Sequence, residues 1–298
     1  MATIRAAASQ VPLSTAAFLA GTAVAVAALL VGPGAPGQSL QLVGLVVLVV
    51  VFGLPHGALD NWLARDRGLF SSPLGWLGFN LAYLGLAAAV VAFWWALPGP
   101  ALAGFLLLSA WHFSGDWRDA LPLWARVGAG LALVSLPALF HPEAVSSIFG
   151  ALSGQSGQVL AGSVGAIAYA VLALLVVIIV RAIRDGQWRV VLELSAVGLL
   201  AALAPPLVFF ALYFCLLHSP RHLGHTLADA PRPARPAMLR SAAAYTLATL
   251  VLAGAVAWLL WPVTTGDELV LKLVFIGLAA LTVPHMLLVD SRPTRRGG

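Results

Sequence analysis

Histidine is the residue type in this sequence that is best suited to chemistry, because most of the chain is apolar. Of 298 residues, 61% are hydrophobic and 9% are charged, yet 7 are histidines. Ionisable residues in or beside apolar membrane segments are costly there and tend to be functional. Five of the seven histidines stand near the ends of apolar segments: His56, His112, His218, His222 and His285. Neutral imidazole suits iron, copper, zinc and nickel, so this set predicts a metal site.

The local spacing supports a shared site. His218 and His222 are four residues apart, so on a continuous helix both rings lie on one face, one turn apart. Pro220 lies between them and can end that turn, which leaves open whether the two rings stay together. Prolines also precede His56 and His285, and breaks of this kind inside a membrane usually line a cavity. The histidines that we predict to bind the metal are His56, His112, His218 and His222.

Carboxylates recur close to these histidines. Asp60 follows His56 by four residues, and Asp116 follows His112 by four. A carboxylate one turn away can bind the second ring nitrogen of a metal-binding histidine and fix its tautomer. The alternative is that both acids are charges at the membrane surface near arginines. We predict a supporting role behind the metal ligands for Asp60 and Asp116. His285 is placed in the same outer layer, with a fifth metal ligand as the alternative.

Two further features lie in apolar runs. Phe210, Tyr213 and Phe214 form an aromatic stripe that leads to His218, and we predict that they line a substrate tunnel, with ordinary helix packing as the alternative. Glu193 is the one acid clearly within an apolar run. Because Arg189 lies one turn before it, we interpret Glu193 as half of an ion pair at the membrane interface.

Long apolar segments must position these side chains. A membrane span needs about 20 mostly apolar residues. We predict an all-α, polytopic helical bundle of about ten transmembrane helices in a single membrane domain, residues 1–298. The spans run roughly over 15–32, 40–58, 74–97, 99–115, 121–140, 159–180, 189–204, 206–222, 240–261 and 268–289. Pro205 and Pro206 separate the seventh span from the eighth, because two adjacent prolines break a helix.

Basic residues predict the orientation of the bundle. Lys and Arg concentrate in cytoplasmic loops, and here they fall before the first span and after the even-numbered spans; Lys272 is the exception. Arg5, Arg292, Arg295 and Arg296 belong to this set at the two ends of the chain. Both termini are therefore predicted to be cytoplasmic, in a multi-pass protein of the inner (cytoplasmic) membrane. Residues 1–39 read as an extra N-terminal helix and loop, with a cleaved signal peptide as the alternative.

Several functions are excluded by composition and motifs. The net charge of +5 forms no basic patch interleaved with aromatic residues, so nucleic acid is not a predicted partner. Cys215 is the single cysteine, so no disulfide can form within the chain. The sequence has no H-E-x-x-H, G-x-S-x-G, P-loop or C-x-x-C motif, which excludes hydrolysis through those devices.

The histidine motifs together resemble one family, the Brp/Blh-type β-carotene 15,15′-dioxygenases. The segments that carry the resemblance are GLPHGALD at 53–60, WHFSGD at 111–116, HSPRH at 218–222 and PH at 284–285, and it covers roughly residues 40–290. These bacterial and haloarchaeal membrane proteins cleave β-carotene at its central double bond to give two molecules of all-trans-retinal, often as chromophore for a rhodopsin.

The resemblance implies a cofactor, a substrate and a site. The family's proposed iron ligands fall on His56, His112, His218 and His222. It implies Fe²⁺ as cofactor, dioxygen as co-substrate, β-carotene or a related carotenoid as substrate reached from membrane lipid, and a functional link to a rhodopsin. The alternatives are another membrane non-haem iron oxygenase of the desaturase or hydroxylase kind, a cytochrome with haem between two histidines, and a transporter that couples transport to protons.

Overall fold

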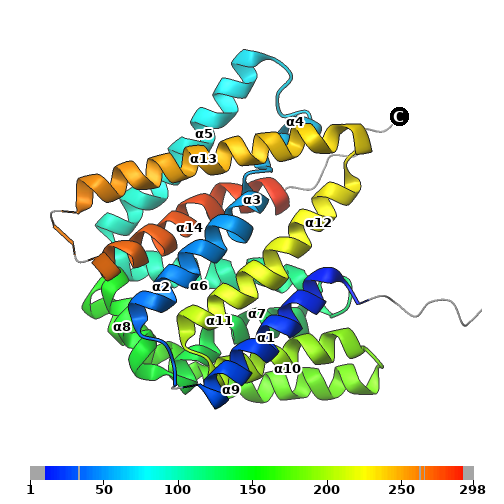
Figure 1. Ribbon diagram of the computed structural model, residues 1–298, viewed down its shortest axis with the longest axis vertical. Coiled ribbons are helices and arrows are strands. Elements are labelled where there is room, and N and C mark those ends of the chain that lie inside the picture. The colour runs from blue at the N-terminus through cyan, green and yellow to red at the C-terminus, as the bar shows by residue number, and fades with distance from the viewer. Residues whose placement is uncertain (1–10, 33, 262, 265, 291–298) are drawn as a thin grey trace, which may run out of the picture.

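The computed structural model describes residues 11–290 apart from 33, 262 and 265, and every regular element in these residues is helical (Figure 1). The elements are α1 (Leu13–Val31), α2 (Gln38–Leu48), η1 (Val49–Gly53), α3 (Leu54–Gly57), α4 (Asp60–Asp66), α5 (Pro73–Ala96), α6 (Pro98–Ser114), η2 (Gly115–Trp117), α7 (Leu123–Phe140), α8 (Pro142–Ser153), α9 (Gln155–Arg184), α10 (Trp188–Leu203), α11 (Pro206–Leu212), η3 (Tyr213–His218), α12 (Ser219–Asp229), η4 (Arg232–Ala234), α13 (Arg235–Leu260) and α14 (Gly266–Asp290). The prediction of an all-α protein is confirmed.

The helices form a bundle whose most buried member is α7. In Figure 1, α5, α13 and α14 lie at the top, α9 and α10 at the bottom, and α2 and α11 cross between them. The α7 helix packs against α6, α9 and α10. Gly130 allows the closest of these approaches, because a Cβ atom there would lie 2.0 Å from the carbonyl oxygen of Ala110 on α6. Small residues let membrane helices approach in this way.

Seven of the described helical segments are long and apolar enough to cross a membrane, and they coincide with seven of the ten predicted spans. The other three predicted spans correspond to shorter or interrupted helices: α6, α10, and the run from α11 through η3 to α12. Helix α10 ends at Leu203 and α11 begins at Pro206, as the two adjacent prolines predict. The count of ten and the orientation of the termini stay predictions.

Helix α8 was not foreseen. Residues 142–153 form α8, which lies between the fifth and sixth predicted spans. Its buried side chains recur at helical spacing: Val145, Ile148, Phe149 and Leu152. At 12 residues α8 is too short to span a membrane, and it packs against α7 and α9.

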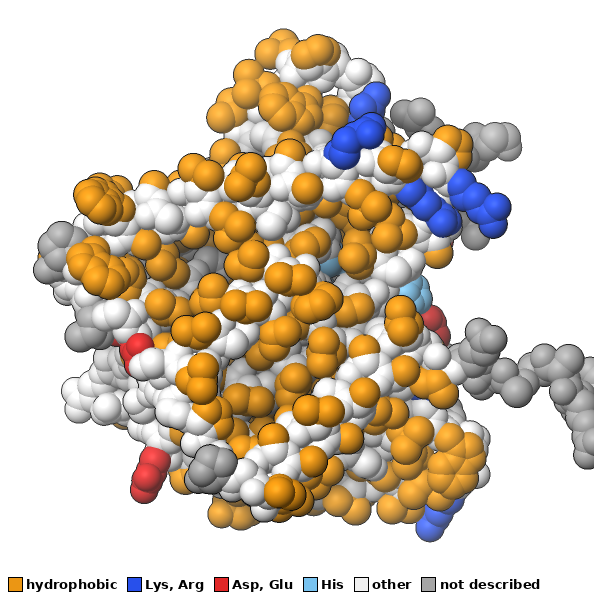
Figure 2. All heavy atoms as spheres, viewed as in Figure 1, with side chains coloured by type: hydrophobic (Ala, Val, Ile, Leu, Met, Phe, Trp, Pro, Cys, Tyr) orange, Lys and Arg blue, Asp and Glu red, His pale blue; other side chains and the backbone are white. Residues whose placement is uncertain are grey.

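The surface is predominantly apolar, as a membrane protein requires. Figure 2 shows hydrophobic side chains over most of one face, with Arg side chains gathered toward the right of the view, where α4 and α12 lie. Lys272 pairs with Glu268 one turn away (Nζ to Oε1, 2.5 Å). Arg5, Arg292, Arg295 and Arg296 lie outside the described residues.

Candidate metal centre

Five histidines from four parts of the chain meet in one ring. His56 comes from α3, His112 from α6, His218 from the end of η3, His222 from α12 and His285 from α14. Neighbouring ring centroids are 4.8 Å apart for His112 and His218, and 5.2–5.7 Å apart around the rest of the ring. We call this set the histidine ring. It contains all four histidines predicted to bind a metal and also His285.

The remaining two histidines lie elsewhere. His141 joins α7 to α8. His225 is exposed on α12, three residues beyond His222.

Two π-helical turns deliver histidines to the ring. The first, η1, ends three residues before His56, and the second, η3, ends at His218. A π-helical turn widens the helix and is common at functional sites. The two turns pack against each other, and Gly53 makes this possible, because a Cβ atom there would lie 2.8 Å from Cε1 of Phe214. The backbone irregularity therefore lies where two segments of the site meet.

The imidazole of His56 is held from behind. Its Nδ1 atom contacts the carbonyl oxygen of Gly53 and lies 2.9 Å from the Oγ atom of Ser219. The Ser219 hydroxyl in turn donates to the carbonyl of Phe52. With the Nδ1 proton directed at these oxygens, the lone pair of His56 is on Nε2.

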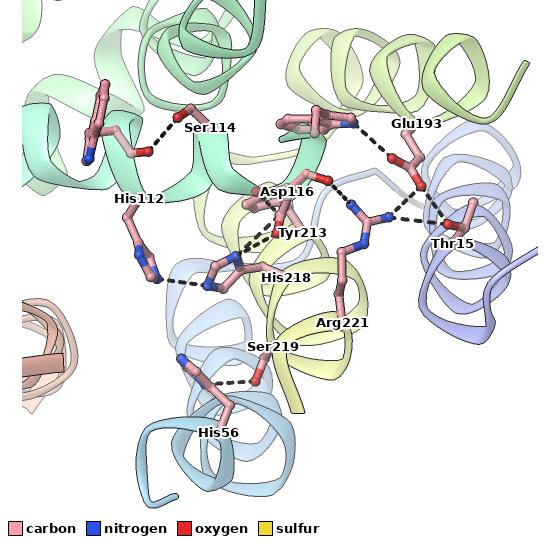
Figure 3. A network of polar contacts seen from close by, with 12 residues as sticks. Thr15, His56, His112, Ser114, Asp116, Glu193, Tyr213, His218, Ser219 and Arg221 are labelled. Carbon is pink, nitrogen blue, oxygen red and sulfur yellow. Dashed lines mark hydrogen bonds and ion pairs between the residues drawn. The ribbon is translucent and has the colours of Figure 1, made fainter. Parts of the chain in front are cut away.

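Asp116 anchors His218 rather than His112. His218 Nδ1 lies 3.2 Å from Asp116 Oδ1, and the hydroxyl of Tyr213 donates to Asp116 Oδ2 at 2.6 Å (Figure 3). His218 Nε2 is then directed at His112 Nε2, 3.1 Å away. Two ring nitrogens at this separation share either one proton or one cation. Nitrogens bound at about 2.1 Å to one metal ion, at angles of about 90–109°, lie about 3.0–3.4 Å apart.

Asp60 likewise serves a histidine from another segment. Its Oδ1 atom lies 2.8 Å from His285 Nδ1, and its Oδ2 atom accepts a hydrogen bond of 2.8 Å from the Tyr83 hydroxyl. The i,i+4 spacing predicted that Asp60 would contact His56. The helix is interrupted between them, because α3 ends at Gly57 and α4 begins at Asp60.

Glu193 is not an interfacial partner of Arg189, and the structure corrects that interpretation. Glu193 is fully buried (0% exposed), and its Oε1 atom lies 2.5 Å from Nη2 of Arg221, which is 9% exposed. Thr15 and Trp117 donate to the same carboxylate at 2.5 and 2.9 Å. Arg221 Nη1 also donates to the main-chain carbonyl of Asp116 at 2.9 Å. This hydrogen bond connects the buried pair to the residue that holds His218, as Figure 3 shows.

A cavity opens beside the ring and shares His56, His112 and His285 as lining residues. It encloses about 950 Å³, its open mouth included, and its walls come from α5, α6, α11, η3, α13 and α14. Phe210 and Phe214 line it and stack on each other (centroids 5.3 Å apart, planes 9° apart). Tyr213, predicted for the same tunnel, is not among the lining residues, because its side chain turns toward Asp116.

The donor set of the ring fits a transition metal. All five side chains of the ring are imidazoles, and three have Nδ1 directed at an oxygen acceptor, which is the arrangement that orients metal-binding histidines in proteins. As placed, no group of three or more His, Cys, Asp or Glu side chains within the described part of the chain is close enough to hold an ion. Closing the ring on a metal therefore requires rotation of imidazoles that already touch edge to face.

Three residues of the site were missed from the sequence: Tyr83, Ser219 and Arg221. Ser219 and Arg221 lie inside the HSPRH segment, so its unusual polarity in an apolar run was the available signal. Tyr83 carried no such signal, because it stands alone on α5, far in sequence from the acid that it contacts.

Comparison with known proteins identifies similar chains. The family model described as "Beta-carotene 15,15'-dioxygenase" matches residues 47–291. A beta-carotene 15,15'-dioxygenase from uncultured marine bacterium 66A03 is 34% identical over 261 residues, covering 82% of this chain and 91% of that relative. A probable beta-carotene 15,15'-dioxygenase, Blh, from Halobacterium salinarum is 29% identical over 319 residues, covering 91% and 90%. No solved structure matches.

Proposed function

The chain belongs to the β-carotene 15,15′-dioxygenase family, and we propose that it performs this cleavage with ferrous iron bound by the histidine ring. It is an oxidoreductase that cleaves β-carotene oxidatively, as its family and relatives do. In the reaction the central C=C bond and the O–O bond of dioxygen break, and two C=O bonds form. Each of the two retinal molecules keeps one oxygen atom.

The observation that carries the iron proposal is the 3.1 Å separation of His112 Nε2 and His218 Nε2 in the ring beside the cavity. His56, His112, His218 and His222 are the proposed iron ligands. Imidazole ligands leave Fe²⁺ with its full charge and with coordination positions for reactants. When bound, ferrous iron supplies the activation of dioxygen next to the substrate.

The protein's own groups orient the ligands and protect the site. Asp116 keeps the proton of His218 on Nδ1, and Ser219 with the Gly53 carbonyl does the same for His56. In both imidazoles Nε2 is therefore the nitrogen left to bind a metal. Phe210 and Phe214 provide an apolar wall for the polyene, and an apolar substrate that fills the cavity would exclude water from the reacting bond.

The substrate reaches this cavity from the lipid. Lining residues come from α5 and α13, and neither spanning segment has a buried residue in its most apolar stretch. Both helices therefore face outward, and an extended hydrocarbon can pass from the bilayer between them. We propose the same cavity as the site for β-carotene or a related carotenoid.

The topology proposal follows from the basic residues. One membrane domain of ten spans in the inner membrane, with both termini cytoplasmic, accounts for the arginines in alternate loops. The retinal that is released is a chromophore of the kind a rhodopsin requires, so a rhodopsin is the proposed user of the product.

The experiment is expression of the full chain in cells that accumulate β-carotene, followed by chromatography of the pigments and metal analysis of the purified protein. We expect loss of β-carotene, appearance of retinal, and about one iron per chain. Intact β-carotene with bound iron would point instead to a desaturase- or hydroxylase-like oxygenase. Intact β-carotene without metal would favour a proton-coupled transporter, and a Soret absorbance band would indicate a cytochrome.

A further inference from the structure

Two relays of the same composition converge on the histidine ring. In one, Tyr213 donates to Asp116, which binds His218 Nδ1. In the other, Tyr83 donates to Asp60, which binds His285 Nδ1. The contacts are matched atom by atom: in each relay the tyrosine uses Oδ2, and the imidazole lies closest to Oδ1. The first relay orients His218, a proposed iron ligand, and the second orients His285 in the same way.

His285 lies close to three of the proposed iron ligands. Its ring centroid lies 5.4 Å from His56, 5.3 Å from His112 and 5.2 Å from His222. No other histidine of the ring touches three proposed iron ligands at distances this short. Imidazoles bound to one metal ion at neighbouring positions have centroids roughly 4.6–5.6 Å apart, given a metal–nitrogen distance of about 2.1 Å. His285 therefore stands within the ring and not behind it.

We propose that His285 is a fifth imidazole ligand of the metal, and that Tyr83 acts through Asp60 as its positioning residue; this rests on the proposed function. Because Asp60 takes the Nδ1 proton, the lone pair of His285 is on Nε2, where a metal binds it. Five imidazoles leave one of six positions of an octahedral ion open. The sequence left open whether His285 supports the ligands or binds the metal itself, and the centroid distances favour the second role.

Tyr83 has a second contact that fits a positioning role. Its hydroxyl lies 3.2 Å from the carbonyl oxygen of Leu281, one turn before His285 on α14, and its side chain lines the cavity. The Tyr83 hydroxyl therefore connects α5 to the Asp60 carboxylate, which holds the His285 imidazole, and to α14, which carries His285. Tyr83 therefore links the proposed metal site to α5, one of the two helices between which the substrate is proposed to enter.

The test uses the purified full-length protein loaded anaerobically with ferrous iron, with iron K-edge X-ray absorption to count imidazole ligands from the scattering of their outer ring atoms, and a chelator competition to measure affinity. His285→Ala is expected to lower the imidazole count by one. Tyr83→Phe removes only one hydroxyl and is expected to weaken iron about 10-fold, as loss of an outer partner of a metal ligand does. Tyr245→Phe is the matched control, since Tyr245 lines the same cavity but bonds Asn80.

The outcomes separate this inference from the proposed function. An unchanged imidazole count in His285→Ala, or equal iron affinity in Tyr83→Phe and Tyr245→Phe, overturns the fifth ligand while the wild-type protein still binds iron and makes retinal. Wild-type protein that binds no iron overturns the proposed iron site itself. If His285→Ala does not fold, the comparison of the two tyrosine variants decides the matter alone.

Discussion

Replacing Arg221 with methionine tests whether the buried ion pair behind the histidine ring supports the fold. The carboxylate of Glu193 is fully buried and has three donors, from Arg221 at 2.5 Å, Thr15 at 2.5 Å and Trp117 at 2.9 Å. The substitution leaves two neutral donors and no compensating charge. Removing one partner of a buried pair costs about 3–5 kcal/mol, which for a chain of 298 residues corresponds to a thermal midpoint lower by about 5–8 °C.

The measurement is thermal unfolding of the purified chain in a mild detergent. Arg181→Met is the matched control, because Arg181 pairs with Asp185 at 3.9 Å on the exposed end of α9. An exposed pair contributes about 0–1 kcal/mol, so the control should unfold near the wild-type temperature. If Arg221→Met unfolds at the same temperature as Arg181→Met, the reasoning about the buried charge is refuted.

A double variant separates stability from metal binding. Arg221→Met with Glu193→Gln removes both charges while an amide oxygen still accepts from Thr15 and Trp117, so the free energy of unfolding should return to within about 1 kcal/mol of wild type. The hydrogen bond from Arg221 to the carbonyl of Asp116 remains lost. Because Asp116 orients His218, iron affinity should stay about 10-fold lower even though stability recovers.

Three further predictions concern the ring and the cavity. Tyr213→Phe removes the 2.6 Å hydrogen bond to the carboxylate that holds His218, and should weaken iron about 10-fold in a chelator competition without changing the walls of the cavity. Gly53→Ala puts a Cβ atom 2.8 Å from a Phe214 ring atom, and should cost about 1–3 kcal/mol in thermal unfolding, whereas Gly44→Ala on α2, with nothing within 4 Å, should cost nothing. Phe210→Ala should raise KM for β-carotene roughly 10-fold with little change in kcat, and an unchanged KM would remove Phe210 from the substrate site.

The helical bundle and the histidines of the site could be predicted from the sequence, because both depend on strong local signals. Apolar runs long enough to span a membrane are recognisable from composition and length alone, and seven such helices are present in the described residues. His56, His112, His218 and His222 stand at the ends of such runs, and the structure brings their rings together. Helix α8 was missed because its apolar face, with Val145 and Ile148, is too short to register as a span.

The partners of the histidines could not be predicted, because helix register does not survive the irregular turns. Asp60 is separated from His56 by a break between α3 and α4, and it binds His285 instead. Asp116 lies in the 3₁₀ turn η2, where each residue advances about 120° rather than 100° about the axis, so it leaves the face that carries His112. Long-range pairing such as that of Glu193 with Arg221 leaves no trace in local spacing.

The most direct test of the central claim, that the histidine ring binds the iron that cleaves β-carotene, compares two alanine variants on one helix. His222 contacts His56 and His285 in the ring, while His225 is exposed three residues later. Iron per purified chain and retinal formed from β-carotene are measured for both. We expect His222→Ala to lose bound iron and retinal formation, and His225→Ala to retain both. Full iron and retinal in His222→Ala, or equal losses in the two variants, would contradict the account.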